Sequence, residues 1–254
     1  MQVAGLSACL VLFLTALLAS CKVPTSSPSS QSSPNRVWKV STLAGSGTGG
    51  HRDGTGTAAR FKDPSGVAVD SGGNIYVADS TNHRIRKITS AGVVSTLAGS
   101  GTGFFANGIG TSAQFNYPRG MAVDSGGNIY VADSHNHRIR KITAAGDVDT
   151  LAGSGAEGFA NGIGTSAQFH RPHGVAVDSV GNVYVADSSN HRIRKITVAG
   201  VVSTLAGSTR GFANGAGTWA GFNDLSGVAV DSDGNVYVAD YGNNRIRKIE
   251  YRVP

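Results

Sequence analysis

Length, composition and charge already exclude several classes of protein. The chain has 254 residues, of which 36 are glycine, and only 15% are charged. Coiled coils need many more charged residues, and collagen needs glycine at every third position, so both classes are excluded. The 40% of apolar residues, which occur in short runs, argue against wholesale disorder. A globular chain with many turns remains, which is typical of an all-β fold. The net charge of +6 indicates a polyanionic partner only if the basic residues cluster.

The N-terminus has the pattern of an export signal. Residues 3–19 form an apolar run that is short for a membrane span and typical of the core of a signal peptide. The run ends in Leu18-Ala19-Ser20-Cys21, which resembles the lipidation site of bacterial lipoproteins. We therefore expect residues 1–20 to be removed and Cys21 to carry lipid. The protein would then be anchored in the bacterial cell envelope, at the outer membrane in a Gram-negative cell. An ordinary secretory signal and an anchor helix are the alternatives.

The segment after the predicted cleavage point has the composition of a tether. Residues 22–35 contain six Ser and three Pro, which cannot build a core. We expect residues 21–35 to connect the lipid to a folded domain. Because the other cysteine, Cys9, lies inside the signal, the mature chain keeps one cysteine and forms no intramolecular disulfide.

An internal repeat fills the rest of the chain, residues 36–254. The sequence Thr-Leu-Ala-Gly-Ser recurs at a constant spacing, at residues 42–46, 96–100, 150–154 and 204–208. Radial repetition of one small unit is typical of propellers and solenoids. Four copies leave no room for a second domain within these residues.

Each unit reads as four short strands separated by turns. In the first complete unit these are 66–70, 75–79, 84–89 and 93–98, which we term strands a to d. Polarity rises from strand a to strand c, which fits a blade whose first strand lies nearest a central axis. The pattern therefore predicts a β-propeller of four-stranded antiparallel blades.

The repeated unit also resembles a known family. The sequence VDSGGNIYVADSTNHRIRKIT, with Asn82-His83-Arg84, is similar to the NHL-repeat signature, and the later copies carry Asn136-His137-Arg138, Asn190-His191-Arg192 and Asn243-Asn244-Arg245. We expect four blades, with residues 37–44 supplying the strand d that completes the C-terminal blade and closes the ring. A closed ring predicts a monomer. An open arc that pairs with another copy is the alternative.

Residues that recur in every unit are interpreted as scaffold. Each unit has an Asp at the end of strand a and another at the end of strand b, which we expect to cap turns and to pair with the nearby Arg. The recurring His83, His137 and His191 are interpreted as turn residues. The basic residues of strand c account for most of the net charge and are expected to be distributed evenly around the outside of the propeller. This charge does not form the dense patch that nucleic acid requires, so we expect no nucleic-acid partner.

Residues that differ between units indicate where a single site could form. Just before the strand-a glycine the chain has Ser65, Arg119, His173 and Ser226, and the turns between strands b and c add Thr81, His135, Ser189 and Tyr241. In propellers these positions surround the mouth of the central channel, and variable side chains on a rigid frame are typical of binding loops. We predict a ligand site at Tyr117, Arg119, His135, His173 and Tyr241. The predicted function is non-catalytic binding of an envelope protein, peptide or glycan, without a cofactor.

Two other functions remain open at this point. The resemblance extends to gluconolactonase-like hydrolases and to a peptide-amidating lyase, which implies a possible metal-dependent hydrolase or lyase at the same mouth. The chain has only Glu157 and Glu250 as glutamates, neither at the start of a strand a, whereas His135, His170 and His173 could supply a zinc site. Adhesion to polyanions through the arginines of strand c is the third hypothesis.

Overall fold

The computed structural model describes residues 38–251, and the residues from Ser41 onward form one compact unit. The predicted signal, the lipidation site at Cys21 and the tether over residues 21–35 lie outside the described residues. Within residues 38–251, no helix is long and apolar enough to cross a membrane.

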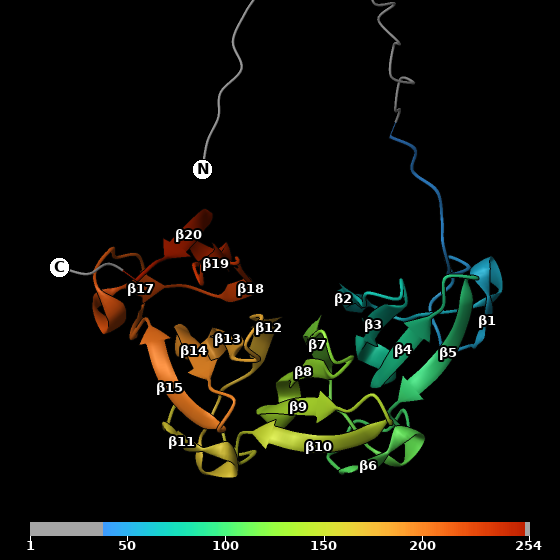
Figure 1. The fold of residues 1–254 in the computed structure, drawn as a ribbon, viewed down its shortest axis with the longest axis horizontal. Coiled ribbons are helices and arrows are strands. Elements are labelled where there is room, and N and C mark those ends of the chain that lie inside the picture. Colours follow the sequence, from blue (N-terminus) through green and yellow to red (C-terminus); the bar gives the residue numbers. More distant parts are fainter. Residues whose placement is uncertain (1–37, 252–254) are drawn as a thin grey trace, which may run out of the picture. The chain divides into compact units, whose positions relative to one another are not determined.

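The fold is all-β, and four antiparallel sheets form a four-bladed β-propeller, as predicted (Figure 1). Blade 1 has the strand order β1 (Gly54–Thr55), β5 (Val93–Ala98), β4 (Arg84–Ile88), β3 (Ile75–Asp79) and β2 (Pro64–Val69). Blade 2 has the order β6 (Gly108–Ile109), β10 (Asp147–Ala152), β9 (Arg138–Ile142), β8 (Ile129–Asp133) and β7 (Pro118–Val123). Blade 3 has the order β11 (Gly162–Ile163), β15 (Val201–Ala206), β14 (Arg192–Ile196), β13 (Val183–Asp187) and β12 (Pro172–Val177). Blade 4 consists of β18 (Leu225–Val230), β19 (Val236–Asp240) and β20 (Arg245–Ile249), and the connector before it forms a parallel pair of β16 (Thr209–Arg210) and β17 (Gly221–Phe222).

Short 3-10 helices shape the connections. Four lie in the turns between the second and third strands of the blades: η2 (Ser80–Asn82), η4 (Ser134–Asn136), η6 (Ser188–Asn190) and η8 (Tyr241–Asn243). Four more lie in the connectors: η1 (Gly56–Ala58), η3 (Gly110–Ser112), η5 (Gly164–Ser166) and η7 (Gly217–Trp219). His83 ends η2 in the left-handed conformation, with φ of 53°, and His137 and His191 do the same in their blades. The prediction that these histidines are turn residues is confirmed.

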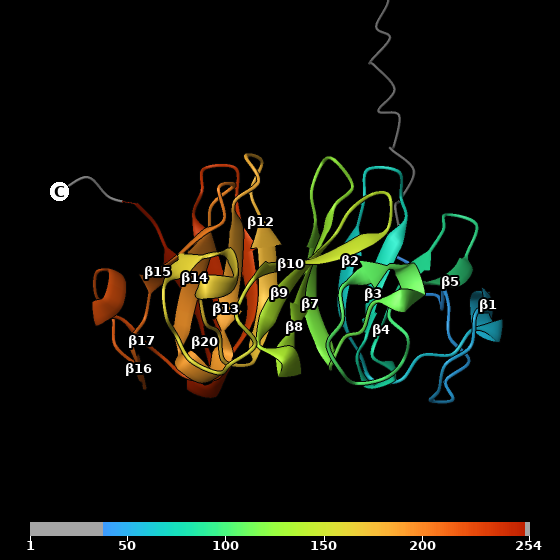
Figure 2. The same ribbon diagram turned by 90° about the horizontal axis from the view of Figure 1, so that it is seen from below.

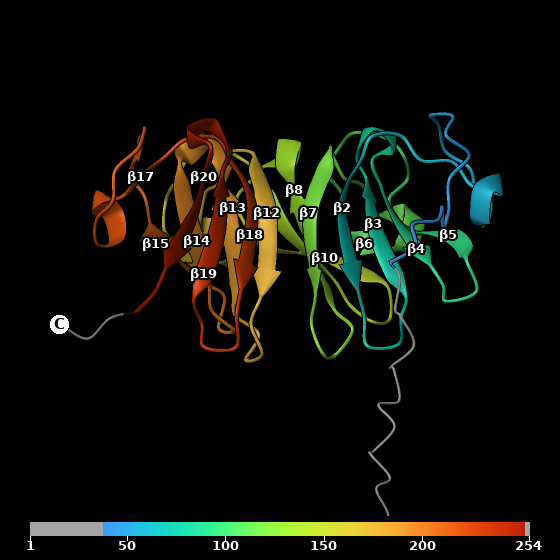
Figure 3. The same ribbon diagram turned by 90° about the horizontal axis from the view of Figure 1, so that it is seen from above.

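The innermost strands of successive blades pack against one another in chain order, β2 on β7, β7 on β12 and β12 on β18 (Figure 3). The strand-a glycine makes this approach possible. A Cβ atom at Gly120 would collide with the carbonyl oxygen of His173, and one at Gly174 would lie 2.8 Å from the carbonyl oxygen of Ser226. Gly227 in β18 has no such neighbour, since the nearest atom to its Cβ position is Cβ of Ala239 at 3.6 Å.

The hydrophobic core lies between the blades. One cluster joins blades 1 and 2 around the fully buried Phe115, a second joins blades 2 and 3 around Phe169, and a third joins blades 3 and 4 around Phe222. Strand b is buried on both faces in the middle blades, because blades stack face to face there. Figure 2 shows the molecule from the side of the outer strand β10.

The predicted closure by the N-terminal strand is wrong for the described part of that segment. Residues 38–44 form no strand, Trp38 and Val40 are almost fully exposed, and the last blade has three strands. The end of the segment otherwise follows the repeat, because the N–H of Gly45 donates to the carbonyl of Gly56 as Gly99 does to Gly110. The difference lies between the last and first blades, since β18 and β2 do not make the extensive contact seen between successive inner strands.

The connectors between blades are ordered, as predicted, but only one of their two phenylalanines packs between blades. Phe115 and Phe169 are fully buried, whereas Phe105 and Phe159 are 39% and 56% exposed. The exposed rings lie under guanidinium groups instead: Cζ of Arg138 is 3.8 Å from the centroid of Phe105. A cation–π contact therefore replaces the predicted hydrophobic packing for this ring.

Candidate functional site

The repeated Asp and Arg residues form a buried scaffold in each blade. In blade 2, Arg140 Nη1 lies 2.9 Å from Oδ2 of Asp133, and both side chains are completely buried. Asp133 also accepts the backbone N–H of Asn116 at 2.7 Å and the side-chain amide of Asn136 at 2.9 Å. This aspartate thus joins the connector, the turn and strand c. The prediction of turn capping and arginine pairing is confirmed for the aspartates at the end of strand b. The aspartates at the end of strand a cap their turns but accept from Asn and Tyr instead of arginine, as Asp124 does from Asn128 and Tyr130.

The same contacts correct the predicted distribution of charge. The middle arginines of strand c in blades 1 to 3 (Arg86, Arg140 and Arg194) are 0% exposed, so they do not lie on the outside of the propeller. Each donates to an aspartate and to backbone carbonyls of the connector that covers it. The hypothesis of polyanion adhesion through these arginines is therefore wrong for the three middle side chains.

Four of the five predicted site residues line one cavity of about 460 Å³. Arg119 is contributed by β7, His135 by η4, His173 by β12 and Tyr241 by η8. The remaining lining residues are Arg171, Ser188, Ser189, Asp224 and Ser226. The strands β7, β12 and β18 pack in sequence (Figure 3), and the residues that line the cavity belong to blades 2, 3 and 4 and their connectors.

The fifth predicted residue, Tyr117, adjoins the cavity through an aromatic contact. Its ring lies 4.6 Å from the imidazole of His135 and 4.8 Å from that of His83. The backbone of Tyr117 has a φ of 49°, which is uncommon for a bulky side chain. Its N–H donates to Nδ1 of His83 at 3.2 Å, so the recurrent turn histidine holds this conformation.

The register of Tyr241 differs from the prediction. The predicted alignment of Tyr241 with His135 and Ser189 is wrong, because Tyr241 begins η8 as Ser134 begins η4 and Ser188 begins η6. Tyr241 therefore replaces a buried serine of the other blades, and its ring is 73% exposed.

The guanidinium groups of Arg119 and Arg171 dominate the electrostatics of the cavity. Burial and the nearby Arg119 lower the pKa of His173 to about 4. Burial together with Arg171 and Arg119 lowers the pKa of His135. Both imidazoles are therefore neutral near pH 7, and each presents one donor and one acceptor nitrogen.

The five predicted site residues did not include Arg171, Ser188 or Asp224, which also line the cavity. Arg171 and Asp224 occupy the repeat position of Tyr117. Tyr117, Arg171 and Asp224 have positive φ angles of 49°, 49° and 48°. Variation at this position is visible in the sequence, so the signal was available for them. Ser188 is identical in three blades, so variation between repeats could not have identified it.

The histidines of the alternative zinc site are not brought together. His170 lies against Glu157, 3.3 Å between Nε2 and Oε2, and its ring contacts His137. His135 and His173 line the cavity together with Asp224 but without a third histidine, and no group of three or more His, Cys, Asp or Glu residues able to hold a metal occurs within residues 38–251. The three histidines of the predicted zinc site therefore do not form one group in this structure.

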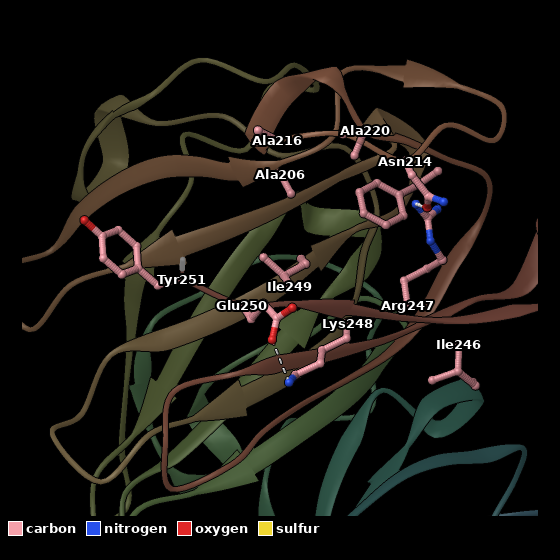
Figure 4. A pocket seen from close by; sticks show the side chains of 13 residues that line it. Ala206, Asn214, Ala216, Ala220, Ile246, Arg247, Lys248, Ile249, Glu250 and Tyr251 are labelled. Carbon is pink, nitrogen blue, oxygen red and sulfur yellow. Dashed lines mark hydrogen bonds and ion pairs between the residues drawn. The ribbon is translucent and has the colours of Figure 1, made fainter. Parts of the chain in front are cut away.

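A larger hollow of about 860 Å³ lies beside β20 (Figure 4). It is lined by Ile246 and Ile249, which match Ile193 and Ile196 of blade 3, where β15 pairs with β14. Ile193 is fully buried in the cluster between blades 3 and 4, whereas Ile246, which has no following blade packed against it, is 76% exposed. Beside β20 there is likewise no strand equivalent to β15. This hollow therefore corresponds to the position of a fourth strand, and we do not interpret it as a ligand site.

Comparison with known proteins identifies the repeat. The family model described as "NHL repeat" matches residues 61–88, 115–142, 169–196 and 222–249. Each match runs from the end of a connector through the first three strands of a blade.

Individual relatives match most of this chain but are much longer. The chain is 32% identical over 181 residues to Protein SUPPRESSOR OF QUENCHING 1, chloroplastic, from Arabidopsis thaliana, which covers 64% of this chain and 17% of that protein. A Bacteroides thetaiotaomicron structure of unknown function superposes with a TM-score of 0.61 at 25% identity, covering 73% of this chain and 46% of that one. An auxiliary nutrient binding protein from the same organism gives 0.62 at 21% identity, covering 76% and 49%. The chain thus spans about half of these solved chains and a sixth of the plant protein.

Proposed function

Because the chain is an NHL-repeat β-propeller, we propose that it is a non-catalytic binding protein whose ligand occupies the cavity between β7, β12 and β18. The observation that carries the proposal is that the repeated side chains and the variable side chains have different roles. Residues identical in the repeats form the buried Asp–Arg scaffold, whereas Arg119, His135 and His173, which differ between repeats, converge on one cavity. A volume of about 460 Å³ suits a small ligand or the end of a larger one, such as a peptide or a glycan.

The proposal places this binding function at the bacterial cell envelope. Support comes from the sequence: the apolar run over residues 3–19, the lipobox-like end at Cys21, and the Ser- and Pro-rich residues that follow. A lipid at Cys21 would hold the propeller near the membrane while the tether leaves the cavity accessible.

The structural relatives are compatible with binding but do not carry the proposal. The Bacteroides protein with the higher TM-score is described as nutrient binding, yet at 21% identity the likeness concerns the fold. The argument for binding therefore depends on the cavity of this chain.

Peptide and glycan arrays test the proposal. We expect the labelled protein to bind a restricted set of ligands, and the double variant Arg119→Ala with His173→Ala to lose them. Ser65→Ala is the matched control, because Ser65 holds the same repeat position in blade 1 and does not line the cavity. Equal binding by the double variant and the wild type would refute the proposed site.

A further inference from the structure

The arginines of the cavity differ from those of the scaffold in their partners. Arg86, Arg140, Arg194 and Arg247 each form an ion pair with an aspartate at 2.8–3.0 Å. In the part of the chain that the structure describes, neither Arg119 nor Arg171 has a carboxylate within ion-pair distance. The Nε of Arg119 is buried without a hydrogen-bond partner among the described residues, as are those of Arg86, Arg140 and Arg194, so the difference is the missing carboxylate.

The charge of the cavity favours a singly charged anion. Arg119 and Arg171 contribute two positive charges, Asp224 contributes one negative charge, and the imidazoles of His135 and His173 are neutral near pH 7. The sum is one uncompensated positive charge. A carboxylate matches this charge and the planar guanidinium fork, whereas a doubly charged phosphate is repelled more strongly by Asp224.

The remaining lining groups suit a ligand that carries hydroxyl groups and not one that carries apolar side chains. Ser188, Ser189 and Ser226 bring short side chains whose hydroxyls both donate and accept hydrogen bonds. The exposed ring of Tyr241 offers an apolar face and a phenolic hydroxyl at the rim. Asp224 adds an acceptor for a ligand hydroxyl group.

We infer that the ligand of this cavity is a sugar acid, a saccharide unit whose carboxylate is bound by Arg119 and Arg171. The serine hydroxyls and Asp224 bind its ring hydroxyls, and Tyr241 packs against its apolar face. This inference rests on the proposed binding function and deepens it by naming the ligand class.

Calorimetric titration with glucuronate, glucuronate methyl ester and glucose tests the inference. The ester keeps the shape of the acid but removes its charge. We expect glucuronate to bind at least tenfold more tightly than either neutral sugar, because hydrogen bonds to charged groups exceed neutral ones by about this factor. Arg119→Gln and Arg171→Gln should each reduce glucuronate affinity about tenfold or more and leave the weak affinity for glucose unchanged. Arg52→Gln, an exposed arginine of blade 1, is the matched control and should bind as the wild type does.

Three outcomes would overturn the inference. The first is equal affinity for glucuronate and its methyl ester. The second is phosphate or acetate binding as tightly as glucuronate, because the sugar would then contribute nothing. The third is array ligands that depend on His173 and Tyr241 but not on Arg119 or Arg171, and in that case the proposed binding function survives while the sugar-acid inference fails.

Discussion

Replacing Arg140 by methionine should be strongly destabilising, because the change leaves Asp133 buried without its cationic partner. Methionine keeps much of the volume of the side chain but removes the ion pair at 2.9 Å. It also removes the hydrogen bonds to the carbonyls of Gln114 and Ala106 and to Oδ1 of Asn107, at 3.0, 2.9 and 2.8 Å. Breaking a buried pair from one side costs about 3–5 kcal/mol. With a denaturant slope of about 2 kcal/mol per molar, this loss lowers the urea midpoint by roughly 1.5–2.5 M.

The assay is urea unfolding followed by far-ultraviolet circular dichroism. Lys141→Met, on the neighbouring position of β9, is the control and should cost less than about 1 kcal/mol. Arg247→Met should cost less than Arg140→Met, since the equivalent side chain in blade 4 is 10% exposed and water can reach its site. Adding Asp133→Asn to Arg140→Met should recover part of the loss, because the unpaired charge disappears. A midpoint for Arg140→Met equal to that of Lys141→Met would refute the buried-pair reasoning.

Three further predictions concern the packing of blades, the cavity and the anchor. Gly120→Ala should cost about 1–3 kcal/mol in the free energy of unfolding, because its Cβ would collide with the carbonyl of His173. Gly227→Ala, at the same repeat position, should be tolerated, and equal urea midpoints for the two variants would contradict this reasoning. In NMR titrations His173 should show a pKa of about 4, and Arg119→Gln should raise this pKa. Because the pKa in the folded state lies below the ordinary 6.5, the free energy of unfolding should fall as pH decreases from about 6.5 to 4. Titration of His173 near 6.5 would exclude the buried environment beside Arg119. Cys21→Ser should abolish incorporation of labelled fatty acid and release the protein from the membrane fraction, and unchanged labelling would refute the lipidation site.

Much of the local structure could be predicted from one repeat. The observed β3 and β5 have the predicted bounds, and β4 ends one residue earlier than predicted. The reason is physical: alternation, turn glycines and asparagines act over a few residues, and four copies of the same pattern reinforce the interpretation. Comparison between copies also separated Asp133, which belongs to the scaffold, from Arg119 and His173, which meet in the cavity.

Other features were decided by the tertiary structure. Arg84 and Arg86 lie two residues apart on one face of β4, so periodicity cannot distinguish them, yet only Arg86 is fully buried, because the connector through Asp53 and Arg60 covers it. The convergence of Arg119, Arg171 and Asp224 likewise depends on how three blades stack.

The sequence by itself determined the blade, its four copies and the positions that vary between them. Whether residues 38–44 reach β20, and which varying side chains share a cavity, followed only from the packing of whole blades. A repeat encodes its contacts with the next blade, such as those of Gly120, but the relation between the first and last blades is the accumulated result of every interface, which no single repeat contains.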